Sequence, residues 1–200
     1  MKFSMPTAGF GVIPMYEELA IFVLAIWFGL PAWIANATPV LGGGGPTIDG
    51  GRFYRDGRRI LGDGKTIRGF IVGVIFGTLT GLLQMLSAPL LYPILEEHVV
   101  VNQAMDEVFF MTVPIAFLLS VGALTGDLIG SFIKRRVRVE SGDPSPMMDQ
   151  LGFIILALIF ATPLIQPNPV FAGILIVTTL GIHWASNAVG YVMGLKKHPW

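Results

Sequence analysis

Three side chains with complementary chemistry follow one another at helical spacing in this chain. Asp127, Ser131 and Lys134 stand at positions i, i+4 and i+7 near the end of an apolar stretch, so in a helix they share one face. A charged side chain at the centre of a membrane span costs about 2.5–3.5 kcal/mol, and by default it marks a functional site. We therefore expect a carboxylate, a hydroxyl and an ammonium group in one cavity. The structural alternative is an interhelical salt bridge of Asp127, or an Asp127 side chain that snorkels to the membrane surface.

A second group of polar residues lies between positions 36 and 68. This segment has nine glycines, six basic residues and three aspartates, with almost no helical or strand periodicity. Glycine lets an anion approach backbone amides, and the segment has a run of four: Gly42, Gly43, Gly44 and Gly45. Further along, Gly62-Asp63-Gly64-Lys65-Thr66 places a carboxylate, a cation and a hydroxyl beside permissive backbone. These features indicate a site for a polyphosphate with a metal ion. A flexible, solvated loop is the alternative.

Few carboxylates are placed to hold such an ion. Mg²⁺ takes one or two protein carboxylates together with substrate phosphates, and Asp127 is the first candidate. Asp149 or Asp63 is the second, although Asp149 also suits the N-cap of the following helix. Gly64-Lys65-Thr66 is not the end of a P-loop, because Arg59 stands where that motif needs glycine. The chain has no cysteine and no Ser/His/Asp or HExxH pattern, so a reaction here would need no protein nucleophile. Phosphoryl or nucleotidyl transfer fits this set of residues.

Apolar stretches must position these residues. The 200-residue chain is 53% hydrophobic and its mean hydropathy is +0.69. Five stretches have the length of membrane spans, which need about 20 residues each: 17–36, 69–91, 108–133, 151–166 and 169–195. We predict an all-α integral membrane protein, one membrane domain over residues 1–200, with loops at 36–68 and 134–150.

The basic residues predict the orientation of these spans. Twelve of the thirteen Lys and Arg residues lie in three clusters, at 52–68, 134–138 and 196–197. Five spans place all three clusters on one side, and cytoplasmic loops carry the Lys/Arg excess. We expect the N-terminus outside, the C-terminus inside and the active site facing the cytoplasm of an integral cell-membrane protein.

Glycines repeat every four residues in two of the spans. The second span has Gly69, Gly73, Gly77 and Gly81, and the third has Gly122, Gly126 and Gly130. Such ridges let another helix approach closely. We interpret them as packing surfaces, which would serve equally within one chain or between the chains of a homo-oligomer.

Two motifs resemble a known family. The segment GALTGDLIGSFIKRR at 122–136, with GDPSPMMDQLGF at 142–153, is similar to the signature of CTP-dependent lipid cytidylyltransferases. That signature has a Gly-Asp-Leu, a Ser, a Lys-Arg pair and a later Asp in the same order. The segment 35–70 is closer to the archaeal branch, the CDP-archaeol synthases. The bacterial members are longer and have more spans, so their outer helices have no counterpart here.

The resemblance implies a reaction and roles for individual residues. CTP and a bis-O-geranylgeranyl-glycerol phosphate would give CDP-archaeol and pyrophosphate, with Mg²⁺ as cofactor, in a lipid bilayer and without a nucleic-acid partner. Asp127 would hold the metal with Asp149 or Asp63, and Ser131 would orient the attacking phosphate or a metal-bound water. The phosphate and nucleotide contacts implied are Lys134, Lys65, Arg68, Arg52, Arg135, Thr66, Asn36, Thr38 and the glycine run from Gly42 to Gly45.

Two other functions are weighed against this one. Small polytopic acyltransferases, such as those that act on glycerol phosphate, also have glycine-rich loops, but they do not need an intramembrane Asp followed by Ser and Lys. A transporter should have polar or broken spans near the bilayer centre and usually an inverted repeat. This chain instead gathers its polar residues at one side, and no repeat is evident.

Overall fold

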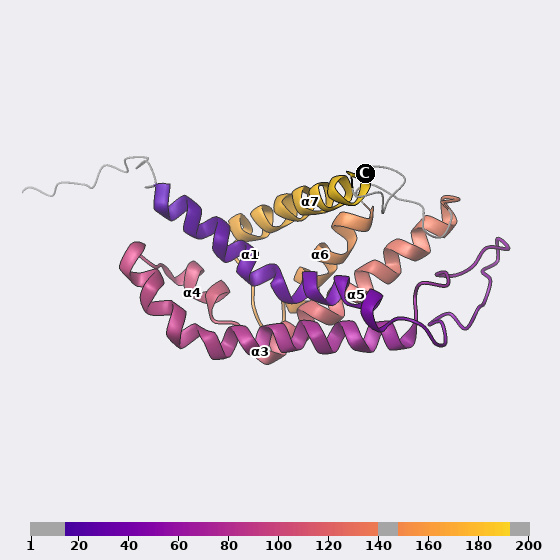
Figure 1. The fold of residues 1–200 in the computed structure, drawn as a ribbon, viewed down its shortest axis with the longest axis horizontal. Helices are drawn as coiled ribbons and strands as arrows, with labels where there is room; N and C mark the ends of the chain where they lie inside the picture. Colours follow the sequence, from indigo (N-terminus) through magenta and orange to yellow (C-terminus); the bar gives the residue numbers. More distant parts are fainter. Residues whose placement is uncertain (1–14, 140–147, 193–200) are drawn as a thin grey trace, which may run out of the picture.

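Helices make up nearly all the regular structure of the chain. The computed structural model describes residues 15–139 and 148–192, and Figure 1 shows how their helices are arranged. In chain order these helices are α1 (Met15–Ala37), α2 (Pro39–Gly42), α3 (Ile67–His98), α4 (Gln103–Phe109), α5 (Val113–Arg136), α6 (Met148–Ala161) and α7 (Pro169–Val192). Over these described ranges the only β-structure is a pair of isolated bridges, in the segment between α2 and α3.

The apolar helices agree with the predicted class of protein. Three segments are long and apolar enough to cross a membrane: Tyr16–Gly42, Ile67–His98 and Val113–Arg136. The apolar parts of α6 and α7, Leu151–Ala161 and Pro169–Ile182, are shorter. The prediction of an all-α membrane protein is thus confirmed. The count of five spans stays a prediction.

Three of the predicted stretches differ in their bounds from the helices of the structure. The third span does not start at 108, because α4 ends at Phe109 and Thr112 caps a new helix by accepting a hydrogen bond from the amide of Ile115. The second span runs on to His98, beyond the predicted end at 91. The fourth ends at Ala161 and not at 166.

The glycine ridge of α3 packs against α1 and α5, as predicted. A Cβ on Gly73 would lie 2.6 Å from the carbonyl oxygen of Ala35, and one on Gly77 would lie 2.6 Å from that of Pro31. A Cβ on Gly81 would collide with the side chain of Ala116 in α5. Only glycine allows these backbones to approach so closely.

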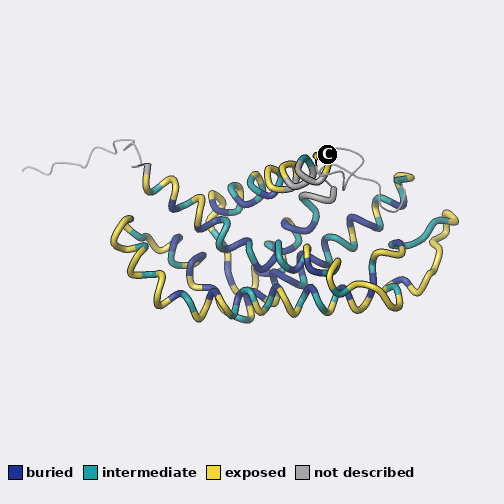
Figure 2. Tube along the Cα trace, viewed as in Figure 1, coloured by how far each residue is buried: buried dark blue, intermediate teal, exposed yellow. Residues whose placement is uncertain are grey.

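The glycines of α5 make the same kind of contact with α6. A Cβ on Gly122 would lie 2.6 Å from the carbonyl oxygen of Leu156, and one on Gly126 would lie 2.7 Å from the Cα of Phe153. Helix α5 is therefore in backbone contact with α3 on one side and α6 on another. The buried residues concentrate where α1, α3, α5 and α6 meet (Figure 2).

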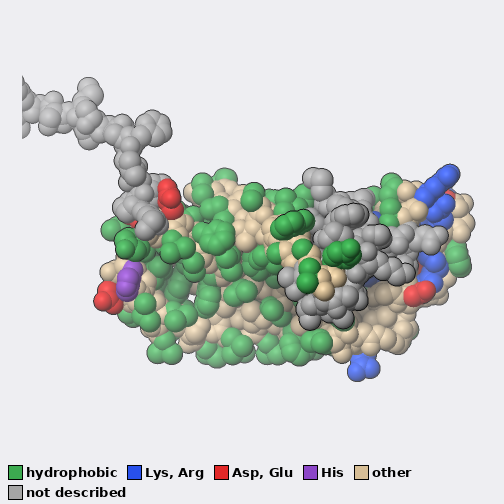
Figure 3. Space-filling model, turned by 45° about the horizontal axis from the view of Figure 1, so that its top comes forward, with side chains coloured by type: hydrophobic (Ala, Val, Ile, Leu, Met, Phe, Trp, Pro, Cys, Tyr) green, Lys and Arg blue, Asp and Glu red, His purple; other side chains and the backbone are tan. Residues whose placement is uncertain are grey.

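Charged side chains gather at the two ends of the elongated molecule (Figure 3). Lys and Arg occupy one end, where α5 finishes and the segment between α2 and α3 lies. Acidic residues lie at the other end, in the first turn of α1 and in α4, and also among the basic residues at the first end. The gathering of the described basic clusters at one end is the one expected from the sequence, and its cytoplasmic orientation stays a prediction.

Candidate functional site

The segment between α2 and α3, residues 43–66, is folded onto itself; we call it the Gly/Arg loop. At its base the amide of Ile48 donates to the carbonyl of Lys65 at 2.8 Å, and the amide of Ile67 donates to that of Pro46 at 3.1 Å. A second hairpin-like contact joins Phe53 and Arg59 nearer the tip. The backbone of Lys65 is therefore fixed at the base of the loop.

A buried carboxylate holds the middle of the Gly/Arg loop. The Asp49 side chain is fully buried, and it accepts hydrogen bonds from the Arg59 guanidinium and the Gly51 amide at 3.0 Å each. It also accepts from the amides of Leu61 at 3.0 Å and Gly62 at 3.3 Å. Burial alone would raise the pKa of Asp49, but the bonds from Arg59, Leu61 and Gly51 outweigh it and hold the pKa well below its usual range.

Thr66 connects the loop to α3. It is the N-cap of that helix, and its hydroxyl accepts a hydrogen bond from the Gly69 amide at 3.1 Å. The residue is buried, so its observed role is to start the helix. Lys65 consequently stands one residue before a fixed helix N-terminus.

Lys65 and Asp127 meet, although they are 62 residues apart in the sequence. The Lys65 ammonium nitrogen lies 2.6 Å from Oδ2 of Asp127, and each side chain is 27% exposed. The salt bridge weighed as an alternative does exist, but the partner comes from the Gly/Arg loop and not from another helix. The contact joins the two parts of the sequence in which we predict phosphate chemistry.

The other predicted residues of α5 have different surroundings. Ser131 is 2% exposed and so lies within the helix packing. Arg135 is also buried, and it donates to the carbonyl of Val139 at 2.7 Å. Lys134 is half-buried and has interactions of its own. The predicted roles of all three toward phosphates stay predictions.

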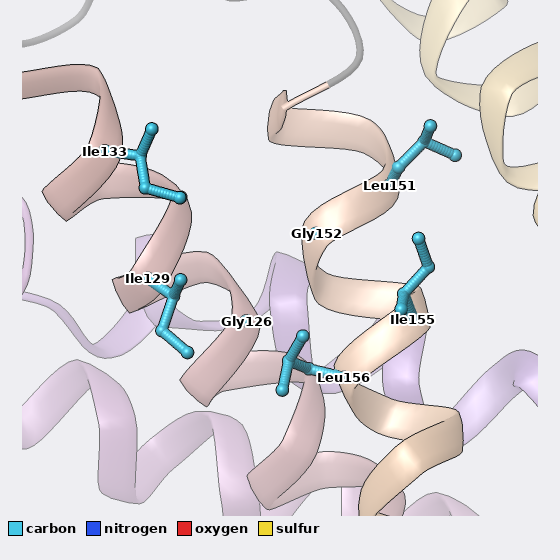
Figure 4. A pocket seen from close by; sticks show the side chains of 8 residues that line it. Gly126, Ile129, Ile133, Leu151, Gly152, Ile155 and Leu156 are labelled. Atoms are coloured by element: carbon cyan, nitrogen blue, oxygen red, sulfur yellow. The ribbon is translucent and has the colours of Figure 1, made fainter. Parts of the chain in front are cut away.

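A groove of about 340 Å³ runs between α5 and α6 (Figure 4). It is lined by glycines and aliphatic side chains of both helices, among them Gly126, Ile129 and Leu156. Asp127 does not line it, so it is not the polar cavity that we expected Asp127, Ser131 and Lys134 to share.

The run of four glycines divides into two pairs. A Cβ on Gly42 would lie 2.6 Å from the side chain of Val72, so Gly42 serves packing, and one on the exposed Gly43 would lie 2.9 Å from the carbonyl of Pro39. Gly44 and Gly45 are exposed, have φ of 99° and 79°, and have no neighbouring atom where a Cβ would stand. Only this second pair presents open backbone to a ligand.

The predicted residues beside α2 differ in the same way. Thr38 is buried, and its hydroxyl donates to the carbonyl of Ile34 at 2.7 Å. Asn36 is half-buried. The predicted cations Arg52 and Arg68 are both exposed.

The carboxylates predicted for a metal have different surroundings. Asp63 is 81% exposed and pairs with Arg59. The backbone of Asp149 lies in the first turn of α6, inside the helix and not at its N-cap, and its side chain is outside the described residues. Among the residues described there is no cluster of three acidic, histidine or cysteine side chains. A Mg²⁺ ion bound mainly by substrate phosphates does not need one.

Asp49 had no predicted role, although it lies at the centre of the Gly/Arg loop. The available signal was Asp49-Gly50-Gly51, since aspartate before glycine is typical of a turn that bonds its own backbone. That pattern predicts a turn but not the partner, Arg59, ten residues away.

Known proteins resemble this chain over most of its length. A family model described as CarS-like CDP-archaeol synthase matches residues 18–200. The CDP-archaeol synthase of Thermococcus kodakarensis is 51% identical over 88% of this chain and 95% of its own. That of Methanocaldococcus jannaschii is 40% identical over 88% and 96%. A solved structure of an intramembrane enzyme for archaeal membrane lipid biosynthesis superposes with a TM-score of 0.66 at 38% identity, covering 82% of this chain and 92% of that one.

Proposed function

The chain belongs to the CDP-archaeol synthase family, and we propose that its Lys65–Asp127 pair is the centre of the site where CTP meets the lipid phosphate. It is a CTP-dependent cytidylyltransferase of archaeal lipid synthesis. The observation that carries the proposed site is the 2.6 Å contact between the two side chains. This contact joins the Gly/Arg loop to the apolar helix α5.

The reaction requires positioning and charge compensation more than covalent help from the protein. An oxygen of the lipid phosphate attacks the α-phosphorus of CTP, and the bond from that phosphorus to the bridging oxygen of pyrophosphate breaks. The attacking oxygen is already anionic, so no general base has to remove a proton. The protein must bring two polyanions together and stabilise the charge that develops on the leaving pyrophosphate.

Lys65 supplies one of the required positive charges. Its ammonium compensates the charge of Asp127, and a triphosphate would offer it a competing anionic partner. Because the backbone of Lys65 is fixed at the base of the loop, only its side chain has to move. The open amides beside Gly44 and Gly45, and the exposed guanidinium groups of Arg52 and Arg68, are the further phosphate contacts that we propose.

Asp127 is the proposed metal ligand. Its carboxylate is partly exposed and already has a cation 2.6 Å away, so the surroundings accept positive charge. Mg²⁺, with Asp149 or Asp63 as a second protein ligand, would neutralise charge on the phosphates when bound. Ser131 and Lys134 would orient the lipid phosphate from the same helix.

The location of the pair fits the two substrates. Asp127 stands nine residues before the end of α5 at Arg136, which corresponds to about 14 Å of helix. We propose that this end faces the cytoplasm, since it carries the basic cluster. CTP would enter from that side while the isoprenoid tails stay in the bilayer.

The test is pyrophosphate release from CTP by purified protein, with and without the geranylgeranyl ether lipid phosphate and with and without Mg²⁺. We expect lipid- and Mg²⁺-dependent release that Asp127→Asn reduces by about 10³-fold, as loss of an electrostatic group at a reacting centre does. Glu97→Gln is the matched control, because Glu97 is an exposed carboxylate at the acidic end. Near-normal turnover by Asp127→Asn, with unchanged Mg²⁺ dependence, would show that the metal role is wrong.

A further inference from the structure

We propose that Arg136 is a positioning residue, which holds the tip of the Gly/Arg loop on the end of α5 and thereby keeps Lys65 at Asp127. The proposal rests on the proposed function of the Lys65–Asp127 pair. It assigns to Arg136 no contact with substrate.

The Arg136 side chain reaches from α5 into the tip of the loop. Its Nε lies 3.1 Å from Oδ2 of Asp56, an ion pair that lacks hydrogen-bond geometry. Its Nη2 donates to the backbone carbonyl of Arg59 at 2.5 Å. One side chain therefore contacts the loop at two points, three residues apart.

Two aromatic rings lie within cation–π distance of the guanidinium group. Its central carbon lies 4.8 Å from the ring centre of Tyr54, in the loop, and 4.9 Å from that of Phe132, one turn earlier in α5. The two rings contact each other edge-to-face at 5.6 Å. A guanidinium that contacts two rings while it donates to a carbonyl and pairs with a carboxylate combines contacts that the compact ammonium of lysine does not reproduce.

These contacts are connected to Lys65 through the loop. Arg59, whose carbonyl Arg136 binds, donates through its own side chain to Asp49. Asp49 in turn accepts from the amides of Leu61 and Gly62, which lead directly to the base where Lys65 lies. The loop is thus attached to α5 at two places, Asp127 and Arg136, about 14 Å apart on one helix.

Attachment at both Asp127 and Arg136 orders the loop before its ligand binds. Fixing a backbone residue costs about 1–2 kcal/mol of conformational entropy, and a loop that is already ordered does not incur this cost when its ligand binds. Arg136 is only 19% exposed, and its guanidinium group lies against two rings, the Asp56 carboxylate and the Arg59 carbonyl. Its positive charge is therefore compensated by groups of the loop and is not available to a phosphate.

The experiment compares Arg136→Lys, Arg136→Gln and Asp56→Asn with the unchanged enzyme. Chymotrypsin cleaves after Phe53 and Tyr54, so its rate at those bonds measures the order of the loop tip without any turnover. We expect cleavage to rise at least about fivefold without CTP and to return to the original rate with saturating CTP. We expect the KM for CTP to rise about tenfold, equivalent to 1.4 kcal/mol, while kcat changes less than about twofold.

Arg138→Gln is the control, because it removes the same charge from an exposed position just after α5. It should leave the cleavage rate, the KM for CTP and the melting temperature unchanged. Two results would overturn the proposal: unchanged cleavage and KM in both Arg136 variants, or equal effects of Arg138→Gln. A fall in kcat and melting temperature at constant KM would overturn it too, because it would assign Arg136 to bundle stability.

If the Arg136 variants do not fold, Asp56→Asn still tests the proposal. Asp56 is an exposed loop residue, so its substitution should leave the helices folded. Failure of this proposal is also distinguishable from failure of the proposed site. Activity of Asp127→Asn reports on the site, whereas cleavage at Phe53 and Tyr54 reports on the loop alone.

Discussion

At the scale of single residues, a buried carboxylate organises the Gly/Arg loop. The Asp49 side chain has no exposed surface and accepts bonds from one guanidinium and three backbone amides. A buried charge is tolerated only when it is paired and hydrogen-bonded, and here both conditions hold. The loop owes its conformation to this arrangement, because it contains no helix or strand of its own.

Asp49→Asn should therefore loosen the loop while the helices remain folded. The substitution removes the charge and one acceptor oxygen, which should cost the loop about 1–3 kcal/mol and raise the exchange rates of the Leu61 and Gly62 amides about tenfold or more. Hydrogen exchange followed by mass spectrometry measures these rates. Amide protection as high as in the unchanged protein would contradict the role of Asp49.

The same carboxylate predicts a pH dependence. Its folded-state pKa is lowered from 3.8, so the stabilisation is fully present above about pH 4 and is lost as the pH falls below that value toward the folded pKa. We expect protection of the Leu61 and Gly62 amides to persist at pH 4 and to decline only under more acidic conditions. In Asp49→Asn this decline should be absent.

Some of these residues could be predicted and others could not. Asp127 was evident because a charge in an apolar helix has a known cost, and Lys65 because it stands among permissive glycines. Asp49 pairs with Arg59, and Arg136 pairs with Asp56. Neither pair has the sequence spacing that brings side chains together in a helix or a strand. Their partners depend on how the loop closes, which no local pattern in the sequence determines.

At the scale of elements, glycine spacing decides which helices touch. The prediction that these glycines serve packing was correct, because a repeat of four places them on one face of any helix. The end of α4 was missed, because Val108, Phe109 and Met111 are as apolar as the helix that follows. The N-cap residue Thr112 separates the two helices, and a hydropathy profile cannot detect a helix cap.

Gly77→Ala should destabilise the bundle. The added methyl group would overlap the hydroxyl of Ser120 and the carbonyl of Pro31, and overpacking of this kind costs about 1–3 kcal/mol. We expect a lower melting temperature in detergent. Gly173→Ala in α7 is the control, because a Cβ there meets no atom within 4 Å and alanine is the better helix former. Equal melting temperatures for the two variants would contradict the packing role.

At the scale of the whole molecule, charge separates the two ends of the helical bundle. Because the chain has no cysteine, single cysteines can report which end faces which compartment. We expect Arg55→Cys in the Gly/Arg loop to react with an impermeant maleimide only from the cytoplasmic side of vesicles. Glu97→Cys should react only from the opposite side. Labelling of both positions from one side would contradict the proposed orientation.

Helix α3 is longer than a bilayer is thick. Its 32 residues span about 48 Å, whereas the hydrocarbon core measures about 30 Å. Pro89 and Pro93 fall in its outer third, beyond the glycine ridge that fixes its inner part to α1 and α5. The inner 22 residues, up to Ala88, already cover about 33 Å. Hydrophobic mismatch would therefore be taken up by tilt of the outer third, which leaves the depth of Asp127 insensitive to membrane thickness.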